Sequence, residues 1–169
     1  MSPAFCVYIR VRGCLLNPGL HFPYLRIWQL PINDYLCMLN QMILIMKKVI
    51  ATPDAPKAVG PYSQAIEVNG TLYISGQIPV NPADGKVQED IVAAAHQSLK
   101  NIGAILKEAG MDYNNVVKTT VLLADIADFK AVNEVYAEYF TGDKPARACY
   151  QAAALPLGVK VEIEAIAVK

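Results

Sequence analysis

The sequence predicts a two-layer α+β domain in which a mixed β-sheet carries two helices on one of its faces. Two observations support this class. Short β-branched runs are separated by turn residues, and two longer segments repeat apolar residues at spacings of three and four. In chain order these segments give the pattern ββαβαββ over residues 46–169. The helices leave the second face of the sheet without a cover.

A β-hairpin is expected to open the domain. Residues 63–68 and 71–75 are short β-prone runs, and Asn69-Gly70 between them is the strongest two-residue hairpin signal, because both turn positions need a positive φ. A loop at 81–85 leads into a helix that ends at Gly110. Its core-facing stripe consists of Ile91, Ala95, Leu99, Ile102, Leu106 and Ala109.

The remaining elements follow the same logic. Residues 116–124 form an apolar, β-branched run that is typical of a buried strand. Asp128 is placed to cap a second helix that Gly142 closes, and residues 146–153 and 159–168 are two further strands. One side of this second helix carries Phe129, Val132, Tyr136, Tyr139 and Phe140.

Residues 1–45 differ from the rest of the chain. They contain three Arg, a single acidic residue, three of the four Cys, and four Pro at intervals too short for a stable helix. The uncharged tail of this part, 35–46, is shorter than the ~20 residues that span a bilayer. We expect residues 1–45 to be an N-terminal extension, disordered or read from an upstream start, and residues 46–169 to be the functional domain. A transit peptide is the alternative.

The charge balance excludes one class of function. Lys and Arg number 15 and Asp and Glu number 15, and the part after Met46 is slightly acidic, at −2. No charge excess is available to hold a nucleic acid or an anionic membrane, so neither partner is expected. The four Cys have no CxxC spacing and no His pair nearby, so neither a zinc site nor a small disulfide scaffold is indicated. An apolar share of 54% suggests a large core or buried subunit interfaces.

Alternation along the last two strands suggests where a site lies. Arg147, Cys149 and Gln151 share one face of their strand, and Glu162 lies on the mixed face of the last strand. If these faces coincide, Arg147 and Glu162 flank a polar pocket that a second subunit would complete. An arginine can bind a carboxylate through two parallel hydrogen bonds, and a glutamate can move a proton. The alternatives are a structural ion pair between the two and a Cys149 that is an inert, buried small hydrophobic residue.

Six motifs, taken in their order along the chain, resemble the reactive intermediate deaminase A (RidA, or YjgF) family over residues 46–169. They are Gly60-Pro61-Tyr62-Ser63-Gln64, Ile74-Ser75-Gly76-Gln77-Ile78-Pro79, the loop at Gly85, Val117-Lys118-Thr119-Thr120-Val121, Pro145-Ala146-Arg147-Ala148-Cys149 and Val161-Glu162-Ile163-Glu164-Ala165-Ile166-Ala167. The resemblance implies a chorismate-mutase-like α+β subunit. It also implies a homotrimer with a central barrel and active sites between subunits.

The resemblance also implies an activity. Members of this family hydrolyse 2-iminobutanoate and 2-iminopropanoate, the reactive products of pyridoxal-phosphate-dependent dehydratases, to 2-oxo acids and ammonia. The protein itself needs no cofactor or metal for this. By the same resemblance Arg147 clamps the substrate carboxylate, Glu162 positions or deprotonates the attacking water, and Tyr62 helps to hold the substrate. The pattern alone leaves Tyr62 as a packed aromatic in a turn.

Four further positions are implied as substrate-binding, and two competing functions stay open. The backbone at Cys149 contacts the substrate, Ser75 and Gly76 line the pocket floor, and Thr120 supports it from the adjoining strand. One competing function is a non-catalytic module that binds small keto or imino acids. The other is a ribonuclease or translation inhibitor, which the slightly acidic domain disfavours. The expected location is the cytoplasm, or the mitochondrion if residues 1–45 are a transit peptide.

Overall fold

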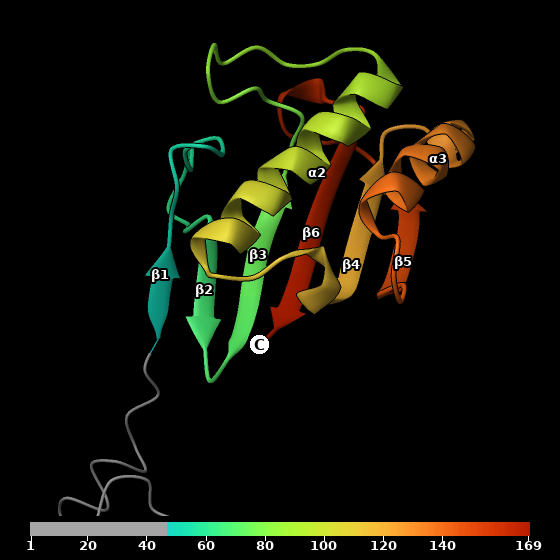
Figure 1. Cartoon of the computed structure of the whole chain (residues 1–169). Coiled ribbons are helices and arrows are strands. Elements are labelled where there is room, and N and C mark those ends of the chain that lie inside the picture. The colour runs from blue at the N-terminus through green and yellow to red at the C-terminus, as the bar shows by residue number, and fades with distance from the viewer. Residues whose placement is uncertain (1–46) are drawn as a thin grey trace, which may run out of the picture. The chain divides into compact units, whose positions relative to one another are not determined.

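The structure is a computed structural model that describes residues 47–169, so the expectation for residues 1–45 lies outside the described residues. In chain order the strands and α-helices are β1 (Lys48–Ile50), β2 (Ala65–Val68), β3 (Thr71–Gln77), α2 (Ile91–Glu108), β4 (Val116–Leu123), α3 (Phe129–Tyr139), β5 (Ala146–Gln151) and β6 (Val161–Val168). Both α-helices lie on the same face of one sheet, which confirms the α+β class (Figure 1). The predicted order lacked β1, a three-residue strand too short to show a pattern.

The predicted hairpin is confirmed. Asn69 and Gly70 have φ values of 50° and 78°, as a two-residue turn of this type requires. The flanking strands β2 and β3 pair antiparallel from Val68 opposite Thr71 to Ala65 opposite Ile74. Strand β3 runs on to Gln77, two residues beyond the predicted end, through an irregularity in its pairing with β6.

The sheet is mixed, with the strand order β1-β2-β3-β6-β4-β5. All neighbours are antiparallel except β4 and β5, which run parallel. Parallel neighbours need a crossover connection, and α3 provides it between these two strands (Figure 1). Strand β5 is therefore an edge strand, with only β4 beside it among the described residues.

Helix α2 packs its predicted stripe onto the sheet. Its start is capped by Asp90, whose carboxylate accepts a 2.9 Å hydrogen bond from the Ala93 backbone N–H, and Gly110 with φ +70° lies just beyond its end. The fully buried members of the stripe are Ala95, Leu99, Ile102 and Leu106. These side chains form one hydrophobic core with the inward residues of β3, β4 and β6.

The second helix begins directly after Asp128, as predicted, but its capping contact and its C-terminal end differ from the prediction. The chain enters α3 through a 3₁₀ turn at Ile126–Asp128, so the carboxylate that caps a backbone N–H belongs to Asp125, and Asp128 makes no capping hydrogen bond. At the other end the C-cap is Phe140, and Gly142 does not have a positive φ. An intervening 3₁₀ turn shifts the capping role by three residues.

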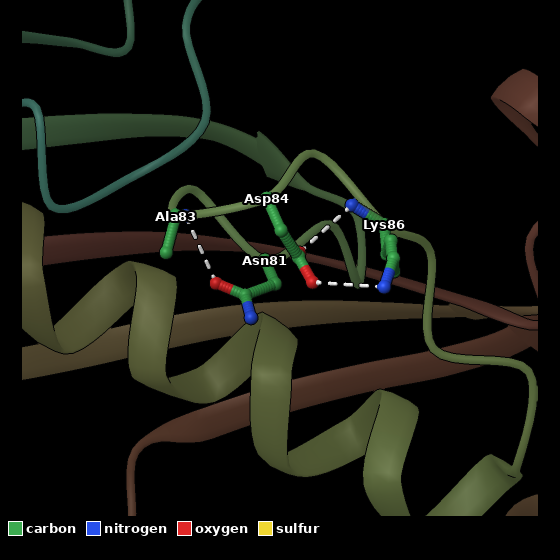
Figure 2. Close-up of polar contacts among 4 residues, drawn as sticks. All are labelled: Asn81, Ala83, Asp84 and Lys86. Atoms are coloured by element: carbon green, nitrogen blue, oxygen red, sulfur yellow. Dashed lines mark hydrogen bonds and ion pairs between the residues drawn. The ribbon is translucent and has the colours of Figure 1, made fainter.

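The predicted loop after β3 folds back on itself. Asn81 and Asp84 each accept a hydrogen bond from a backbone N–H two residues further on, at 3.0 Å from Ala83 and 3.1 Å from Lys86 (Figure 2). The Lys86 ammonium also lies 3.6 Å from the Asp84 carboxylate. Gly85, with φ +70°, allows the reversal. The loop is thus closed by local polar contacts.

The burial pattern of strand β6 distinguishes the two faces of the sheet. The side chains of its odd-numbered residues from 161 to 167 are buried in the core under the helices. The even-numbered ones, Glu162, Glu164, Ile166 and Val168, project from the opposite face, which we call the open face. No helix within residues 47–169 has the length and apolarity to cross a membrane.

Candidate functional site

Arg147 and Cys149 lie on the helix-covered face, at the edge of the sheet. The guanidinium carbon of Arg147 is 4.8 Å from the centre of the Tyr136 ring and 5.6 Å from that of Phe129, and both rings belong to α3. These distances are typical of cation–π contacts. Cys149 points the same way and packs against the core. We call Arg147, Cys149, Phe129 and Tyr136 the arginine cluster.

The guanidinium keeps its hydrogen-bonding groups available. Among the described residues, the ion pairs are Lys86 with Asp84 and Lys169 with Glu67, and no hydrogen bond involves the Arg147 side chain. The side chain is also exposed to solvent. Its planar fork of N–H donors can therefore meet a carboxylate from outside the subunit.

The thiol of Cys149 is not prepared for nucleophilic chemistry. Burial raises its pKa, and the nearby Arg147 offsets this only in part, so the neutral thiol dominates at physiological pH. An activated cysteine needs the opposite shift. Because β5 is an edge strand, the backbone around Cys149 has one side without a neighbouring strand in the described chain. This placement is compatible with the prediction that the backbone at Cys149, rather than its sulfur atom, contacts a ligand.

Glu162 lies on the open face, against Gly76 of β3. A Cβ atom added to Gly76 would stand 1.8 Å from the Glu162 Oε1 atom and 2.7 Å from its carboxyl carbon. The carboxylate thus occupies space that only a glycine leaves free. Burial and then the neighbouring Glu164 carboxylate raise the pKa of Glu162 above its ordinary value. Such a shift brings a carboxyl group closer to the range useful for proton transfer at neutral pH.

The strand beneath Glu162 is irregular at this point. The pairing of β3 with β6 shifts register between Ile74 and Gln77, so Ser75 and Gly76 form a bulge. The Gln77 side chain is buried, and its amide N–H group donates a 2.9 Å hydrogen bond to the Ser75 carbonyl. This contact holds the bulge from inside the core. The sequence motif indicated the three residues but not the bulge they form.

The turn that carries Tyr62 is fastened to the same bulge. The Ser75 hydroxyl donates a 2.7 Å hydrogen bond to the Ser63 carbonyl, and the Ser75 N–H donates to the Gln64 carbonyl at 3.0 Å. Tyr62 is 49% exposed, so its ring is available to a ligand rather than packed into the core. We call Glu162, Gly76, Ser75 and Tyr62 the glutamate cluster.

Thr120 lies on the open face, opposite Glu164 of β6. It borders a shallow hollow of about 310 Å³ between strands β2, β3, β4 and β6. Polar side chains of the hollow are contributed by Tyr73, Ser75, Lys118, Thr120 and Glu164. Sequence reasoning missed the neighbouring Thr119, which points to the other face. Its hydroxyl shares a 2.8 Å hydrogen bond with the Tyr136 hydroxyl beside Arg147.

The structure does not bring the predicted site residues together in one pocket of one subunit. Arg147 lies over α3 on the helix-covered face, whereas Glu162 projects from the open face. The expectation that Arg147 and Glu162 lie on the same face of the sheet is therefore wrong within one subunit. Arg147 pairs with Thr119 of β4, whose side chain is buried in the core, so Arg147 lies on the helix-covered face. The alternative of a structural ion pair between Arg147 and Glu162 is also wrong, since the described residues form none.

Comparisons with known proteins agree with this architecture. Residues 52–169 match the family model described as Endoribonuclease L-PSP. The chain is 60% identical to the mouse protein named 2-iminobutanoate/2-iminopropanoate deaminase, over 76% of this chain and 96% of that protein. It is 56% identical to the human protein of the same name, over 76% and 94%. A plant relative, Reactive Intermediate Deaminase A, chloroplastic, from Arabidopsis thaliana, is 54% identical over 73% of this chain and 66% of that protein.

Solved structures give the same result. The YjgF gene product from E. coli is 48% identical, with a TM-score of 0.71 over 72% of this chain and 98% of that one. E. coli TdcF, solved with bound serine, is 43% identical, with the same score and coverage. Fold and sequence thus define a mixed-sheet α+β subunit with two helices on one face. The chain belongs to the RidA (YjgF) family, whose sequence model carries the Endoribonuclease L-PSP description.

Proposed function

We propose that this protein hydrolyses the reactive imines 2-iminobutanoate and 2-iminopropanoate to the corresponding 2-oxo acids and ammonia. Relatives with 56–60% identity over nearly their whole length carry this activity in their names. The structural observation that supports it most directly is Arg147, an exposed guanidinium stacked on aromatic rings with its N–H donors available. Such a group suits the carboxylate that every 2-imino acid carries.

The proposed reaction uses the two clusters for different steps. Arg147 binds the substrate carboxylate, with the backbone at Cys149 beside it, and so orients the imine carbon for attack. Glu162 positions a water molecule and accepts its proton as the oxygen bonds to that carbon, and the imine nitrogen takes up a proton from solvent. Glu162 then gives its proton to the nitrogen of the resulting carbinolamine, the C–N bond breaks, ammonia leaves, and the oxygen loses its remaining proton to solvent as the carbonyl group forms. The balance needs only water, so we propose no metal or cofactor.

The other residues of the glutamate cluster have supporting roles in this proposal. The Tyr62 side chain is exposed, and its hydroxyl, which accepts a 3.4 Å hydrogen bond from the Val59 backbone N–H, can donate one to the substrate nitrogen or carboxylate. Ser75 and Gly76 form the floor, and Thr120 supports it from β4. The support for these roles is the position of Ser75. Its hydrogen bonds connect the turn that contains Tyr62 to the bulge under Glu162.

We further propose that the protein is a homotrimer whose sites lie between subunits. The support comes from the two faces of the sheet, because one subunit carries Arg147 on one face and Glu162 on the other. A neighbouring copy that covers the open face would bring its own Arg147 to Glu162. Such a head-to-tail contact closes into a ring with identical sites. The sheets of the three copies would then form a central barrel.

The test is an assay of imine breakdown. A threonine dehydratase generates 2-iminobutanoate in a buffer without competing amines, and release of 2-oxobutanoate or ammonia is followed with and without the full-length chain. We expect acceleration by the unmodified protein and a loss of at least about 100-fold in the Arg147→Ala variant, because a charge-assisted double hydrogen bond is removed. The matched control is Lys100→Ala, which removes an exposed cation from α2 and should leave the rate unchanged.

Two other outcomes would replace this proposal. Binding of 2-oxobutanoate without turnover would identify a sensor of small keto or imino acids. Cleavage of RNA that co-purifies with the folded protein and weakens with salt would support the ribonuclease suggested by the family description, against the −2 charge of residues 46–169. No acceleration with several imino acids would refute the deaminase proposal.

For location, we propose the cytoplasm. The alternative is mitochondrial import directed by residues 1–45, and the chloroplastic Arabidopsis relative is the reason to test for an organelle. A fluorescent protein fused after Lys169 distinguishes the two, because deletion of residues 1–45 would redistribute the signal only if they direct import.

A further inference from the structure

The Arg147 guanidinium is held by ring faces alone. Within the described part of the chain no carboxylate pairs with it and no acceptor takes a hydrogen bond from it. The contacts that define its position are therefore those to Tyr136 at 4.8 Å and Phe129 at 5.6 Å. A long, exposed arginine side chain otherwise samples many rotamers, and each binding event has to select one.

The Tyr136 ring is itself fixed. It is only 6% exposed, and its hydroxyl shares a 2.8 Å hydrogen bond with the Thr119 hydroxyl, which is completely buried. Thr119 is also the residue of β4 that pairs with Arg147 across the parallel ladder. The ring also packs against Phe140, with centroids 4.3 Å apart. Thr119 thus connects the two: it pairs with the strand residue Arg147, and it hydrogen-bonds the ring against which the guanidinium packs.

The chemistry of Tyr136 suits this position. Burial raises the pKa of its hydroxyl, with the Thr119 hydrogen bond and Arg147 acting in the opposite direction, so the phenol stays protonated at neutral pH. A neutral ring presents its electron-rich face to the cation without forming an ion pair. The N–H groups at the edge of the guanidinium then remain for a ligand.

We propose that Tyr136 is a positioning residue that pre-orients Arg147 for the substrate carboxylate, with Phe129 bordering the guanidinium on its exposed side. The identity of that substrate rests on the proposed function, but the orientation of Arg147 does not. An aromatic ring, rather than an acidic residue, restrains the cation here. An acidic partner would have to be displaced by each incoming carboxylate, whereas a ring face would not.

The experiment compares variants of the full chain by two readouts. Nitrogen-15 NMR of the Arg147 Nε–H group reports on the ring contact, and titration with 2-oxobutanoate, the stable carboxylate product of the proposed reaction, reports on binding. We expect Tyr136→Leu to move the Arg147 resonance toward that of a free arginine. We also expect it to weaken binding by roughly 10-fold and to raise KM more than it lowers kcat.

Three further variants make the test specific. Tyr136→Phe keeps the ring and should stay within about 2-fold of the unmodified protein. Phe129→Leu changes a side chain that is 40% exposed, so the fold should tolerate it, and should weaken binding by about 3-fold. Tyr139→Leu is the matched control, because it removes a ring from the same helix that contacts His96 and Tyr113 instead of Arg147.

The outcomes separate this proposal from the proposed function. If the unmodified protein does not hydrolyse imines, the proposed function fails, and the NMR and binding comparison still decides the role of Tyr136. If Tyr136→Leu and Phe129→Leu bind 2-oxobutanoate no more weakly than Tyr139→Leu, with an unchanged Arg147 resonance, the positioning role is refuted. Should Tyr136→Leu fail to fold, Phe129→Leu decides whether the rings restrain Arg147: an Arg147 resonance and a 2-oxobutanoate affinity equal to those of Tyr139→Leu refute the proposal.

Discussion

The arginine cluster and the glutamate cluster are built by different means. Arg147 stands on an edge strand, exposed, and is restrained by two ring faces. Glu162 stands on an interior strand, half-buried, in space left by a glycine and a bulge. The first arrangement keeps a permanent charge ready for a partner from outside the subunit. The second one shifts the pKa of a titratable group.

The two arrangements separate a group suited to binding a charge from a group suited to proton transfer within a small subunit. A guanidinium stays charged at any physiological pH, so exposure costs it nothing and keeps its donors available. A carboxylate needs burial for its pKa to rise, and burial requires a shaped wall. Placing the two groups on opposite faces satisfies both demands, at the cost that one subunit alone holds only half of each proposed site.

The largest effect is expected when the two clusters are inactivated in different copies of the chain. Arg147→Ala and Glu162→Gln are each expected to remove activity. Co-assembly of equal amounts of the two chains should restore about a quarter of the activity, because in the proposed trimer each site between subunits takes Arg147 from one copy and Glu162 from its neighbour. The measurement is the rate of 2-oxobutanoate release from the mixed trimers.

The control is a mixture of the same two proteins that were purified as separate trimers and not allowed to exchange. It should stay inactive. If co-assembled trimers also stay inactive, while their mixed composition is verified by mass spectrometry, both residues act from the same subunit. The assignment of the two faces to neighbouring copies would then be wrong.

A second, somewhat smaller effect is expected for Gly76→Ala. Its new Cβ would overlap the Glu162 carboxylate, and the flexible end of that side chain must move while the backbone can stay. A displacement of this size should lower kcat by roughly 100-fold, with KM changed far less because Arg147 is untouched. Steady-state kinetics of imine hydrolysis provide the measurement.

Gly142→Ala is the matched substitution. An added Cβ there meets only the Asn114 amide oxygen at 3.2 Å, and no residue of either cluster lies beside it. Both variants should unfold at similar temperatures. Equal activity of Gly76→Ala and the unmodified protein would show that the space under Glu162 does not matter for catalysis.

Most of the fold could be predicted from the sequence because the signals are local. The Asn69-Gly70 turn, the stripe of α2 and the glycine after that helix each follow from the geometry of a few neighbouring residues. The short strand β1 could not be predicted, since three residues carry no periodicity and its pairing partner is distant in sequence. The capping hydrogen bond at the start of α3 was assigned to Asp128 instead of Asp125 because a 3₁₀ turn precedes the helix.

The candidate site was predicted as a set of residues but not as a geometry. Alternation within a strand places Arg147 and Cys149 on a common face, yet it cannot say whether that face matches the one that carries Glu162 two strands away. The contacts of Tyr136 with Arg147 and of Gly76 with Glu162 join distant segments. They depend on the register of the sheet, which single-sequence patterns do not fix.

The mildest effect concerns the contribution of Glu164 to the pKa of Glu162. Burial is the larger cause of the raised pKa of Glu162, and the Glu164 carboxylate is the second. Removing that neighbour in Glu164→Gln should lower the pKa of Glu162 but leave it above the ordinary value of about 4.3. If Glu162 must be ionised to accept a proton, the acid limb of kcat/KM should shift to lower pH, and kcat at neutral pH should hardly change.

The sign for stability follows from the same shift. A carboxyl group whose pKa is higher in the folded than in the unfolded state costs stability as the pH rises through the interval between the two values, and costs nothing below that interval. Glu164→Gln should therefore stabilise the protein relative to the unmodified chain near pH 7 and give no gain below about pH 4.

Carbon-13 NMR titration of the Glu162 carboxyl gives the pKa directly, and thermal unfolding at the two pH values gives the stability. Glu134→Gln, which removes an exposed carboxylate from α3, should leave the Glu162 titration unchanged. An identical Glu162 titration in Glu164→Gln and the unmodified protein would mean that burial against Gly76 alone sets the charge of the glutamate cluster.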